Sequence, residues 1–243
     1  TNVTSTKANG TYTTGEVIGI TITFSEVVNV TGTPQITLET GGTDAVVDYS
    51  SGTTTNTLTF NYTVAAGHTS ADLDYVATSS LVLNSGTIKD AALNAATLTL
   101  PAIGAAGSLA VNKAIVIDTV SPTIAITSTT TGVSDGSTTS DATIALTFTT
   151  SESTTDFVVG DITATNGALS SFTAVSGTSY TAIFTPTGPG ACTIDVAADK
   201  FTDGASNDNT ASDQFNWTFD NVAPTVTNVT STKANGTYTT GEV

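Results

Sequence analysis

The sequence predicts an all-β protein made of tandem sandwich domains. Threonine makes up nearly a quarter of its 243 residues, and valine, isoleucine and glycine are also abundant. β-Branched residues favour strands, and no window carries the i, i+3, i+4 apolar spacing of a long helix. Turn signals such as Gly41-Gly42 and Asn166-Gly167 separate short runs of alternating residues, as expected for strands joined by tight turns.

Four runs alternate most clearly between apolar residues and threonine or other polar residues. They are residues 18–24, 58–64, 144–148 and 215–219. Successive side chains of a strand point to opposite faces, so one face of each run belongs to a core and the other is mostly threonine. The spacing of turns gives about seven short strands per domain, which is typical of an immunoglobulin-like β-sandwich.

Residues 227–243 repeat residues 1–17 without a substitution, which gives the sequence a period of 226 residues. Identity over such a length indicates duplication of a whole unit and therefore a tandem array. We expect identical copies of the repeat to adjoin one another in the same chain. An array adds reach, or presents one weak contact many times.

A weaker repeat marks the domain joints. The stretch Asp118-Thr-Val-Ser-Pro-Thr123 recurs as Asp220-Asn-Val-Ala-Pro-Thr225, and proline favours an extended entry into a strand. Domain one is predicted at residues 1–117 and domain two at 118–219, with the first strand and turn of the next repeat at 220–243. That last piece cannot bury a core alone, so we expect a head-to-tail neighbour to hold 227–243 in the slot that 1–17 occupies. The alternative is the continuation of a longer filament.

The charge is strongly acidic, with 21 acidic residues against five lysines, no arginine and a net charge of −16. Such a surface repels phosphate backbones, which excludes nucleic acid as a partner. Solvation alone is a sufficient reason for so much charge. No apolar stretch is long enough to span a bilayer, so we expect no membrane span in this fragment and any secretion signal or anchor outside it.

The acidic residues gather in loops at the ends of the predicted sandwiches. One pole of domain one is expected to collect four carboxylates, those of Glu16, Asp72, Asp74 and Asp118. The opposite pole carries Glu26, Asp90 and Asn94, domain two repeats this set as Glu152, Asp203 and Asn207, and Asp220 opens the next linker. The pattern Asp-x-Ala-x-Asn thus occurs at the corresponding place in both domains.

Carboxylates gathered at a pole need a partner. Two of them in contact repel by roughly 4 kcal/mol at an effective dielectric near 20, which is large against a domain stability of about 5–15 kcal/mol. Either the side chains splay into water or a hard cation lies among them. Ca²⁺ accepts about six to eight such oxygens, so Ca²⁺ sites at the joints are predicted. The chain has one cysteine, Cys192, predicted to be a core residue, so no internal disulfide supplies rigidity.

Several stretches resemble the bacterial immunoglobulin-like repeats of very large adhesins and calcium-binding cell-surface proteins. They are Phe24-Ser-Glu26, residues 30–38, Asp72-Leu-Asp-Tyr75, Asp90-Ala-Ala-Leu-Asn94 and the two Asp-x-Val-x-Pro-Thr linkers. The resemblance covers both domains. It implies a secreted array, extracellular and attached to the cell surface, in which Ca²⁺ stiffens the joints.

Two departures from the family pattern put parts of the predicted sites in doubt. The usual glycine of the Asp-Ala-Ala-Gly-Asn loop is Leu93 in domain one and Ser206 in domain two, so its left-handed turn is not assured. Domain two also has Thr149-Thr-Ser-Glu152 where Ser25-Glu26 follows Phe24 directly in domain one. Because of that insertion, the position of Glu152 in the loop does not follow from that of Glu26.

No catalytic arrangement accompanies the paired acids, so the chain is predicted not to be an enzyme. His68 is the sole histidine and is expected to face solvent in a Gly-His-Thr-Ser turn, in a different domain from Cys192. The predicted function is a Ca²⁺-rigidified spacer that extends an adhesive tip. The alternative is a module that itself binds a carbohydrate, a protein or a sister chain. Aromatic residues mostly fall on core-facing positions, which favours the spacer.

Overall fold

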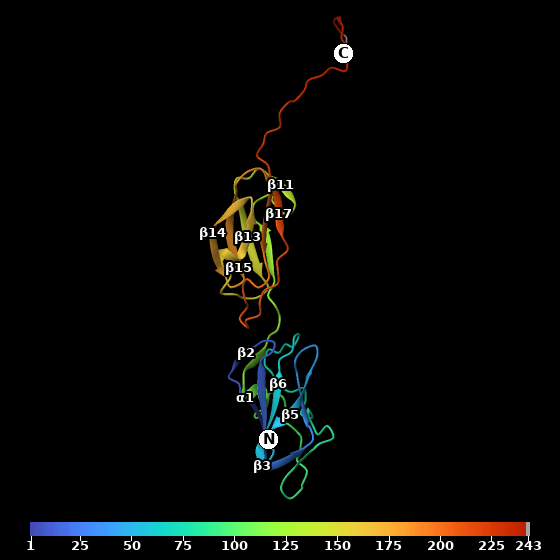
Figure 1. Cartoon of the computed structure of the whole chain (residues 1–243), viewed down its shortest axis with the longest axis vertical. Helices are drawn as coiled ribbons and strands as arrows, with labels where there is room; N and C mark the ends of the chain where they lie inside the picture. Colours follow the sequence, from blue (N-terminus) through green and yellow to red (C-terminus); the bar gives the residue numbers. More distant parts are fainter. Residues whose placement is uncertain (242–243) are drawn as a thin grey trace.

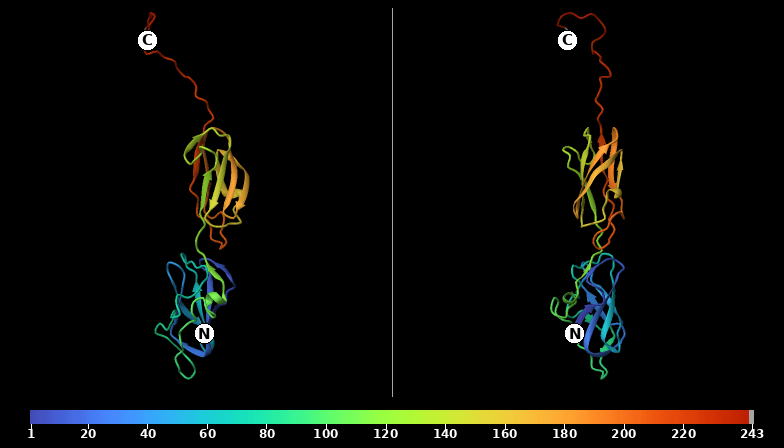
Figure 2. Two further views of the ribbon diagram at one scale, coloured as in Figure 1. Left: turned by 180° about the vertical axis from the view of Figure 1, so that it is seen from behind. Right: turned by 90° about the vertical axis from the view of Figure 1, so that its left-hand side faces the viewer.

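The computed structural model describes residues 1–241 and confirms the all-β fold. Two sandwich domains follow one another end to end, and the C-terminal segment projects from the far end of the second (Figure 1). Figure 2 shows the same serial arrangement from two further sides. Each domain has its own hydrophobic core, the first built between Val3 and Ile117 and the second between Ile124 and Phe219.

Domain one contains one sheet of seven strands, a parallel pair and one short helix, α1 (Leu109–Asn112). The large sheet has the order β1-β3-β6-β5-β4-β7, with β8 also paired to β3. Its strands are β1 (Asn2–Ser5), β3 (Val17–Thr31), β4 (Gln35–Leu38), β5 (Ala45–Ser51), β6 (Thr55–Thr63), β7 (Leu81–Val82) and β8 (Thr87–Lys89). The parallel pair joins β2 (Gly10–Tyr12) to β9 (Ile115–Ile117).

Domain two is a sandwich of two four-stranded sheets. One sheet has the order β10-β12-β15-β14 and the other β11-β17-β16-β13, with β11 parallel to β17. The first sheet comprises β10 (Ile124–Ser128), β12 (Ile144–Thr150), β15 (Ser179–Pro186) and β14 (Gly167–Ser176). The second comprises β11 (Ser137–Thr139), β17 (Phe215–Phe219), β16 (Gly190–Val196) and β13 (Ile162–Thr165), which follows the 3-10 helix η1 (Val159–Asp161).

All four alternating runs form strands, and their apolar residues are buried as predicted. In β6 the buried side chains Leu58, Phe60 and Tyr62 alternate with more exposed ones. Strand β3 differs, because Gly19 on its polar face is buried as well. A Cβ atom at Gly19 would lie only 2.7 Å from the Thr6 hydroxyl oxygen and 3.5 Å from the Asn61 side-chain oxygen, so polar side chains cover a face that a simple alternation assigns to solvent.

Strand β3 also continues past the point where the sequence predicts its end. Glu26 lies within the strand, which runs to Thr31 and pairs with β8 over its last residues. A register shift between Thr23 and Val28 separates this part from the part paired with β6. Such a bulge bends a strand, so Glu26 sits at the bend and not at a strand end.

The two copies of the seventeen-residue repeat adopt different structures. In domain one, residues 1–17 contain β1 and β2, which pair with β3 and β9. The identical residues 227–241 contain no strand and are exposed along the described part of the segment; the last two residues of the predicted 227–243 piece lie outside the described residues. The sequence is the same, so strand formation depends on the partner strands and not on local propensity.

Candidate metal centre

Three carboxylates from separate parts of the chain meet at the joint between the domains. Asp118 follows β9 in the linker, Glu152 follows β12, and Asp203 lies in the loop between β16 and β17. One carboxylate oxygen from each lies within 4.8 Å of the others. Within residues 1–241 this is the one group of three or more His, Cys, Asp or Glu side chains at such distances.

The loop that carries Asp203 is held by its own hydrogen bonds. The Asp203 carboxylate accepts the backbone N–H groups of Ala205 at 2.8 Å and Asn207 at 2.9 Å, and the Asn207 side-chain amide at 2.9 Å. Ser206 closes the turn with φ 68°. The left-handed turn is therefore present without glycine, and Ser206 does not prevent this loop from forming.

The corresponding loop of domain one repeats this geometry. Asp90 accepts the Asn94 backbone N–H and side-chain amide, both at 2.8 Å, and Leu93 has φ 70°. These hydrogen bonds from Asn94 lower the pKa of the Asp90 carboxyl. Leu93 thus adopts the turn that the family pattern gives to glycine, because the Asp–Asn hydrogen bonds fix the backbone on both sides of it.

Asp118 is positioned by a short turn in the linker. Its backbone N–H donates to the Tyr12 carbonyl at 3.0 Å, and its carboxylate accepts the Val120 N–H at 3.0 Å. Asp220 makes the same two contacts, with the Thr139 carbonyl and the Val222 N–H, each at 2.9 Å. The linker repeat seen in the sequence is therefore a repeat of hydrogen-bonded geometry.

Asn207 connects the two domains directly. Its side-chain amide donates to the Asp118 backbone carbonyl at 3.2 Å, while its side-chain oxygen accepts a hydrogen bond from the Thr13 hydroxyl. Thr13 was not among the predicted site residues. It lies in a Thr-Tyr-Thr-Thr run of a threonine-rich chain, and nothing in that run sets it apart from its neighbours.

The electrostatics of the three-carboxylate group favour a cation. Partial burial, together with the charges of Asp118 and Asp203, raises the pKa of Glu152. Asp203 is buried, and the other two side chains are half-buried. In residues 1–241 the one ion pair joins Lys7 to Glu16, so no lysine neutralises this group. The donor set is oxygen only, which fits a hard divalent cation such as Ca²⁺.

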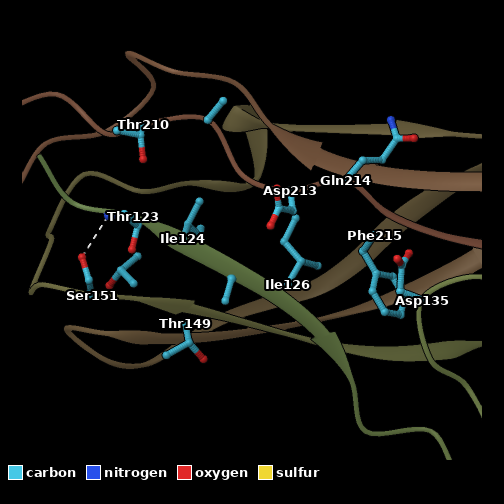
Figure 3. Close-up of a pocket in the computed structure, with 13 residues that line it drawn as sticks. Thr123, Ile124, Ile126, Asp135, Thr149, Ser151, Thr210, Asp213, Gln214 and Phe215 are labelled. Atoms are coloured by element: carbon cyan, nitrogen blue, oxygen red, sulfur yellow. Dashed lines mark hydrogen bonds between the residues drawn. The ribbon is translucent and has the colours of Figure 1, made fainter.

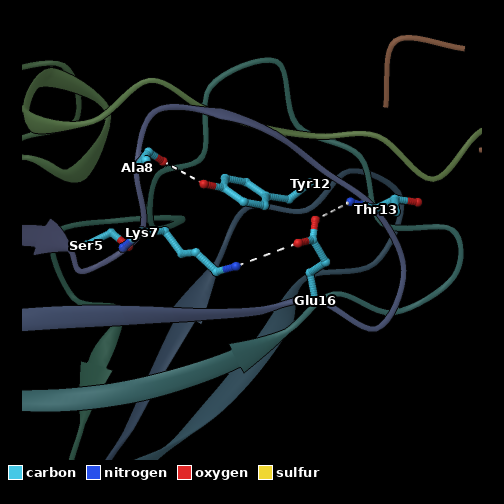
Figure 4. A network of polar contacts seen from close by, with 6 residues as sticks. All are labelled: Ser5, Lys7, Ala8, Tyr12, Thr13 and Glu16. Atoms are coloured by element: carbon cyan, nitrogen blue, oxygen red, sulfur yellow. Dashed lines mark hydrogen bonds and ion pairs between the residues drawn. The ribbon is translucent and has the colours of Figure 1, made fainter. Parts of the chain in front are cut away.

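Glu16 does not take part in this group, contrary to the prediction that four acids meet there. Its carboxylate lies 3.6 Å from the Lys7 ammonium and accepts the Thr13 N–H at 3.3 Å (Figure 4). Lys7 also lies 4.8 Å from the Tyr12 ring centroid, and Tyr12 donates to the Ala8 carbonyl at 2.8 Å. Glu16 therefore closes a local turn between β2 and β3.

Asp72 and Asp74 also stay outside the close group around Asp118. Asp72 is exposed, whereas Asp74 is only 5% exposed. One oxygen of Asp74 accepts the Tyr75 N–H at 2.9 Å, and the other is buried with no hydrogen-bond partner in the described part of the chain. Burial and the Asp74 charge together raise the pKa of Tyr75 to about 12. The predicted pole of domain one is thus divided among separate local contacts.

At the opposite pole of domain one, Glu26, Asp90 and Asn94 line one cavity together with Thr1. Two carboxylates are present there, one fewer than at the joint. Asp220, the last predicted ligand, is exposed at the far end of domain two.

His68 and Cys192 have structural surroundings. Contrary to prediction, His68 is half-buried, with its Nδ1 atom 2.8 Å from the Tyr62 hydroxyl and its ring stacked on Tyr62. Cys192 is fully buried in the core of domain two, as predicted, and burial raises the pKa of its thiol.

An open groove lies beside β10 and not at the joint. It has a volume of about 650 Å³ and is lined by Ile124 and Ile126 on one side and by Asp213 and Phe215 on the other (Figure 3). In domain one the edge of the corresponding strand β1 is covered, since the Val3 backbone N–H donates to the Gly107 carbonyl at 2.8 Å. The edge of β10 faces the open groove instead.

Comparison with family models supports the fold of domain two. Residues 118–219 match a family model described as a bacterial Ig-like domain, which indicates a surface or extracellular module of a class that is typically structural and non-enzymatic. A solved structure of InvD from Yersinia pseudotuberculosis aligns with 95% of this chain at 16% identity and a TM-score of 0.35. The chain spans 60% of that structure's length. No curated protein matches the sequence.

Among residues 1–241, no helix has the length and apolar character needed to cross a bilayer.

Proposed function

We propose that this chain is a repeat module of a large secreted adhesin, serving as a spacer that Ca²⁺ stiffens and that carries an adhesive tip away from the cell surface. The observation that supports this most is the meeting of Asp118, Glu152 and Asp203 at the joint of two domains arranged in series. A cation held by these three side chains would offset their mutual repulsion.

The chain's own residues prepare the joint for this role. Asp118 belongs to the linker, and its turn directs the carboxylate at Glu152 and Asp203. Asn207 holds Asp203 from within domain two and reaches Thr13 and the Asp118 carbonyl across the joint. The domains bend about the linker that contains Asp118. Holding this linker against domain two therefore restricts the bending.

The test compares Ca²⁺ with a chelator in melting and small-angle scattering experiments. At one hundred times its dissociation constant a ligand stabilises the folded state by about 2.7 kcal/mol, so Ca²⁺ should raise the melting temperature and narrow the distribution of domain orientations. Asp118→Asn keeps the acceptor for the Val120 N–H but removes the charge, and should abolish most of both effects.

Asp220→Asn is the matched control, because Asp220 makes the same turn without the other two carboxylates. It should leave the Ca²⁺ response unchanged. A melting curve and a scattering profile that do not respond to millimolar Ca²⁺ would overturn the metal part of the proposal.

A second candidate is an adhesive module that binds a ligand itself, and the groove beside β10 favours it. An open strand edge can accept an extended peptide as an added strand. This function takes second place because Phe215 is the one aromatic residue lining the groove, so a stacking platform for sugars is lacking there. Ala125 is an exposed residue that lines the groove. Ala125→Lys should abolish peptide binding if the groove is used and have no effect on adhesion otherwise.

A further inference from the structure

The pole of domain one opposite the joint has an open cavity beside an exposed loop. The cavity measures about 350 Å³, and its lining includes Thr1, Glu26, Asp90 and Asn94. The loop that carries Asp90 and Asn94 follows β8 at the outer end of domain one (Figure 1). At the matching pole of domain two, the linker and Thr13 of the preceding domain fill this place.

The two poles are built alike but differ in what touches them. Asn94 and Asn207 make the same two contacts with their loop aspartates, at 2.8–2.9 Å. Asn207 also contacts Thr13 and the Asp118 carbonyl and is half-buried. Asn94 is exposed, so its side chain keeps the free hydrogen-bonding capacity that Asn207 uses across the joint.

The far end of domain two supplies the counterpart surface. The pair β11–β17 repeats the parallel pair β2–β9, and the next backbone N–H in each case, Asp220 or Asp118, donates to the last residue of the partner strand. By this correspondence Ser140 occupies the place of Thr13. Ser140 is exposed and offers the same hydroxyl donor that Thr13 offers to Asn207.

The linker is long enough for the same contact to form. Ser128 and Ser5 correspond, because each hydroxyl donates to a carbonyl of the adjacent strand and accepts the N–H two residues on. Ser128 follows Asp118 by ten residues, and Ser231, the repeat of Ser5, follows Asp220 by eleven. The additional residue adds at most about 3.5 Å of reach, so the linker is not too short.

An exposed apolar side chain adds to this fit. Leu93 is 75% exposed at the tip of its loop. Its counterpart Ser206 lines a crevice at the joint together with Thr13 and Thr14 of domain one. A leucine at that position would bury its side chain against the end of a neighbouring domain.

We infer that the outer pole of domain one is the docking surface for the C-terminal end of domain two of another copy of the repeat. Asn94 pairs with Ser140 of that copy, Leu93 packs beside it, and the Asp220 turn enters the cavity between Glu26 and Asp90. The inference rests on the array assumed in the proposed function, and docking would bring Asp220, Glu26 and Asp90 together as Asp118, Glu152 and Asp203 are at the central joint.

The test uses the chain lengthened by one period, so that residues 227–243 continue into a complete second copy. Ser140→Cys in the first copy is combined with Asn94→Cys in the second. Disulfides need Cα atoms about 4.4–6.8 Å apart, so docking should give rapid cross-linking under mild oxidation. Thr13→Cys with Asn207→Cys is the positive control at the central joint. Ser140→Cys with Asn94→Cys, both in the first copy, is the negative control, since these positions lie at opposite ends.

We expect the inter-repeat pair to oxidise at least tenfold faster than the negative control and at a rate similar to the central pair. A rate equal to the negative control would overturn the docking surface. Stiffening of the central joint by Ca²⁺ is measured separately, so a failure of docking leaves the proposed function intact, and a joint indifferent to Ca²⁺ leaves the docking result valid.

Discussion

Glu16 and Glu152 show how the partner decides what a carboxylate does. Each lies beside a strand of its sandwich and close to the joint, yet Glu16 pairs with Lys7 and Glu152 faces Asp118 and Asp203. The lysine neutralises the first glutamate, whereas the second is repelled by its neighbours and partly desolvated, which raises its pKa. The free energy stored in that repulsion is available to a cation.

Glu152→Gln should stabilise the metal-free protein. A raised pKa means that Glu152 favours folding below its ordinary pKa of 4.5 and that this contribution is lost as pH rises through the higher folded-state value. At pH 7 in chelator, the uncharged variant should therefore gain on the order of 1 kcal/mol from relieved repulsion, or a few degrees in melting temperature. The same variant should lose most of the Ca²⁺ response. Calorimetry from pH 4 to pH 8 checks both, and a variant less stable in chelator would show that repulsion is not the governing term.

Leu93→Gly should stabilise domain one. Leu93 has φ 70° and is mostly exposed, and a side chain costs about 1–2 kcal/mol in the left-handed region. Glycine gives back about 0.5–1 kcal/mol through its greater freedom in the unfolded chain, so the net gain should be roughly 0.5–1 kcal/mol. Ala92→Gly, at the adjacent exposed position without a positive φ, should be destabilising. Urea unfolding of both variants measures the difference, and equal losses would mean that Leu93 is not strained.

At the scale of elements, the identical segments 1–15 and 227–241 show which features depend on local sequence and which depend on contacts with the rest of the domain. In both copies the lysine ammonium lies over the tyrosine ring, with Lys7 at 4.8 Å from Tyr12 and Lys233 at 5.1 Å from Tyr238. The tyrosine hydroxyl bonds to the same backbone carbonyl in both. The turn is thus a local property, while the strands on either side of it form only where β3 and β9 pair with them.

Tyr12→Ala and Tyr238→Ala form a matched pair that measures this difference. Tyr12 packs against the core of domain one, so its loss should cost roughly 1–3 kcal/mol of unfolding free energy. Tyr238 is exposed, and its loss should stay within about 0.5 kcal/mol. Chemical denaturation at low protein concentration gives both values. Equal losses would indicate that a head-to-tail neighbour holds residues 227–243, a result that concentration-dependent sedimentation would identify.

The sequence predicted elements better than it predicted contacts between them. Alternation in residues 58–64 was sufficient to place β6 and its buried face, because that signal is local. The bend of β3 at Glu26 depends on pairing with β8, and the separation of Asp74 from Asp118 depends on the path of a loop, so neither follows from spacing. Asp118, Glu152 and Asp203 could be grouped from topology, since each lies at one pole of a sandwich. Thr13 could not, because its role arises from docking of a second domain.

On the scale of the whole molecule, the chain is a series of compact units joined by narrow contacts. Direct side-chain bonds across the central joint run from Asn207 to Thr13 and to the Asp118 carbonyl. Each domain has a separate core, so no apolar packing from one core continues into the other. The direction of the next domain depends on the linker and on these few polar groups, which makes stiffness adjustable without any change to the fold.

Asn207→Ala should therefore loosen the joint without unfolding either domain. The variant loses the hydrogen bonds to Thr13 and to the Asp118 carbonyl. It also loses the hydrogen bond from the Asn207 amide to the Asp203 carboxylate, which orients that candidate metal ligand. Asn94→Ala is the matched control, because it removes the corresponding hydrogen bond to Asp90. Asp90 lies at the outer pole of domain one, which domain two does not contact (Figure 1). Within its own domain each variant loses one side-chain hydrogen bond to the loop aspartate, Asp203 or Asp90, so neither domain should unfold. Only Asn207→Ala should broaden the distribution of inter-domain distances in scattering with Ca²⁺ present. Equal rigidity in the two variants would mean that the linker alone, and not Asn207, fixes the direction of the array.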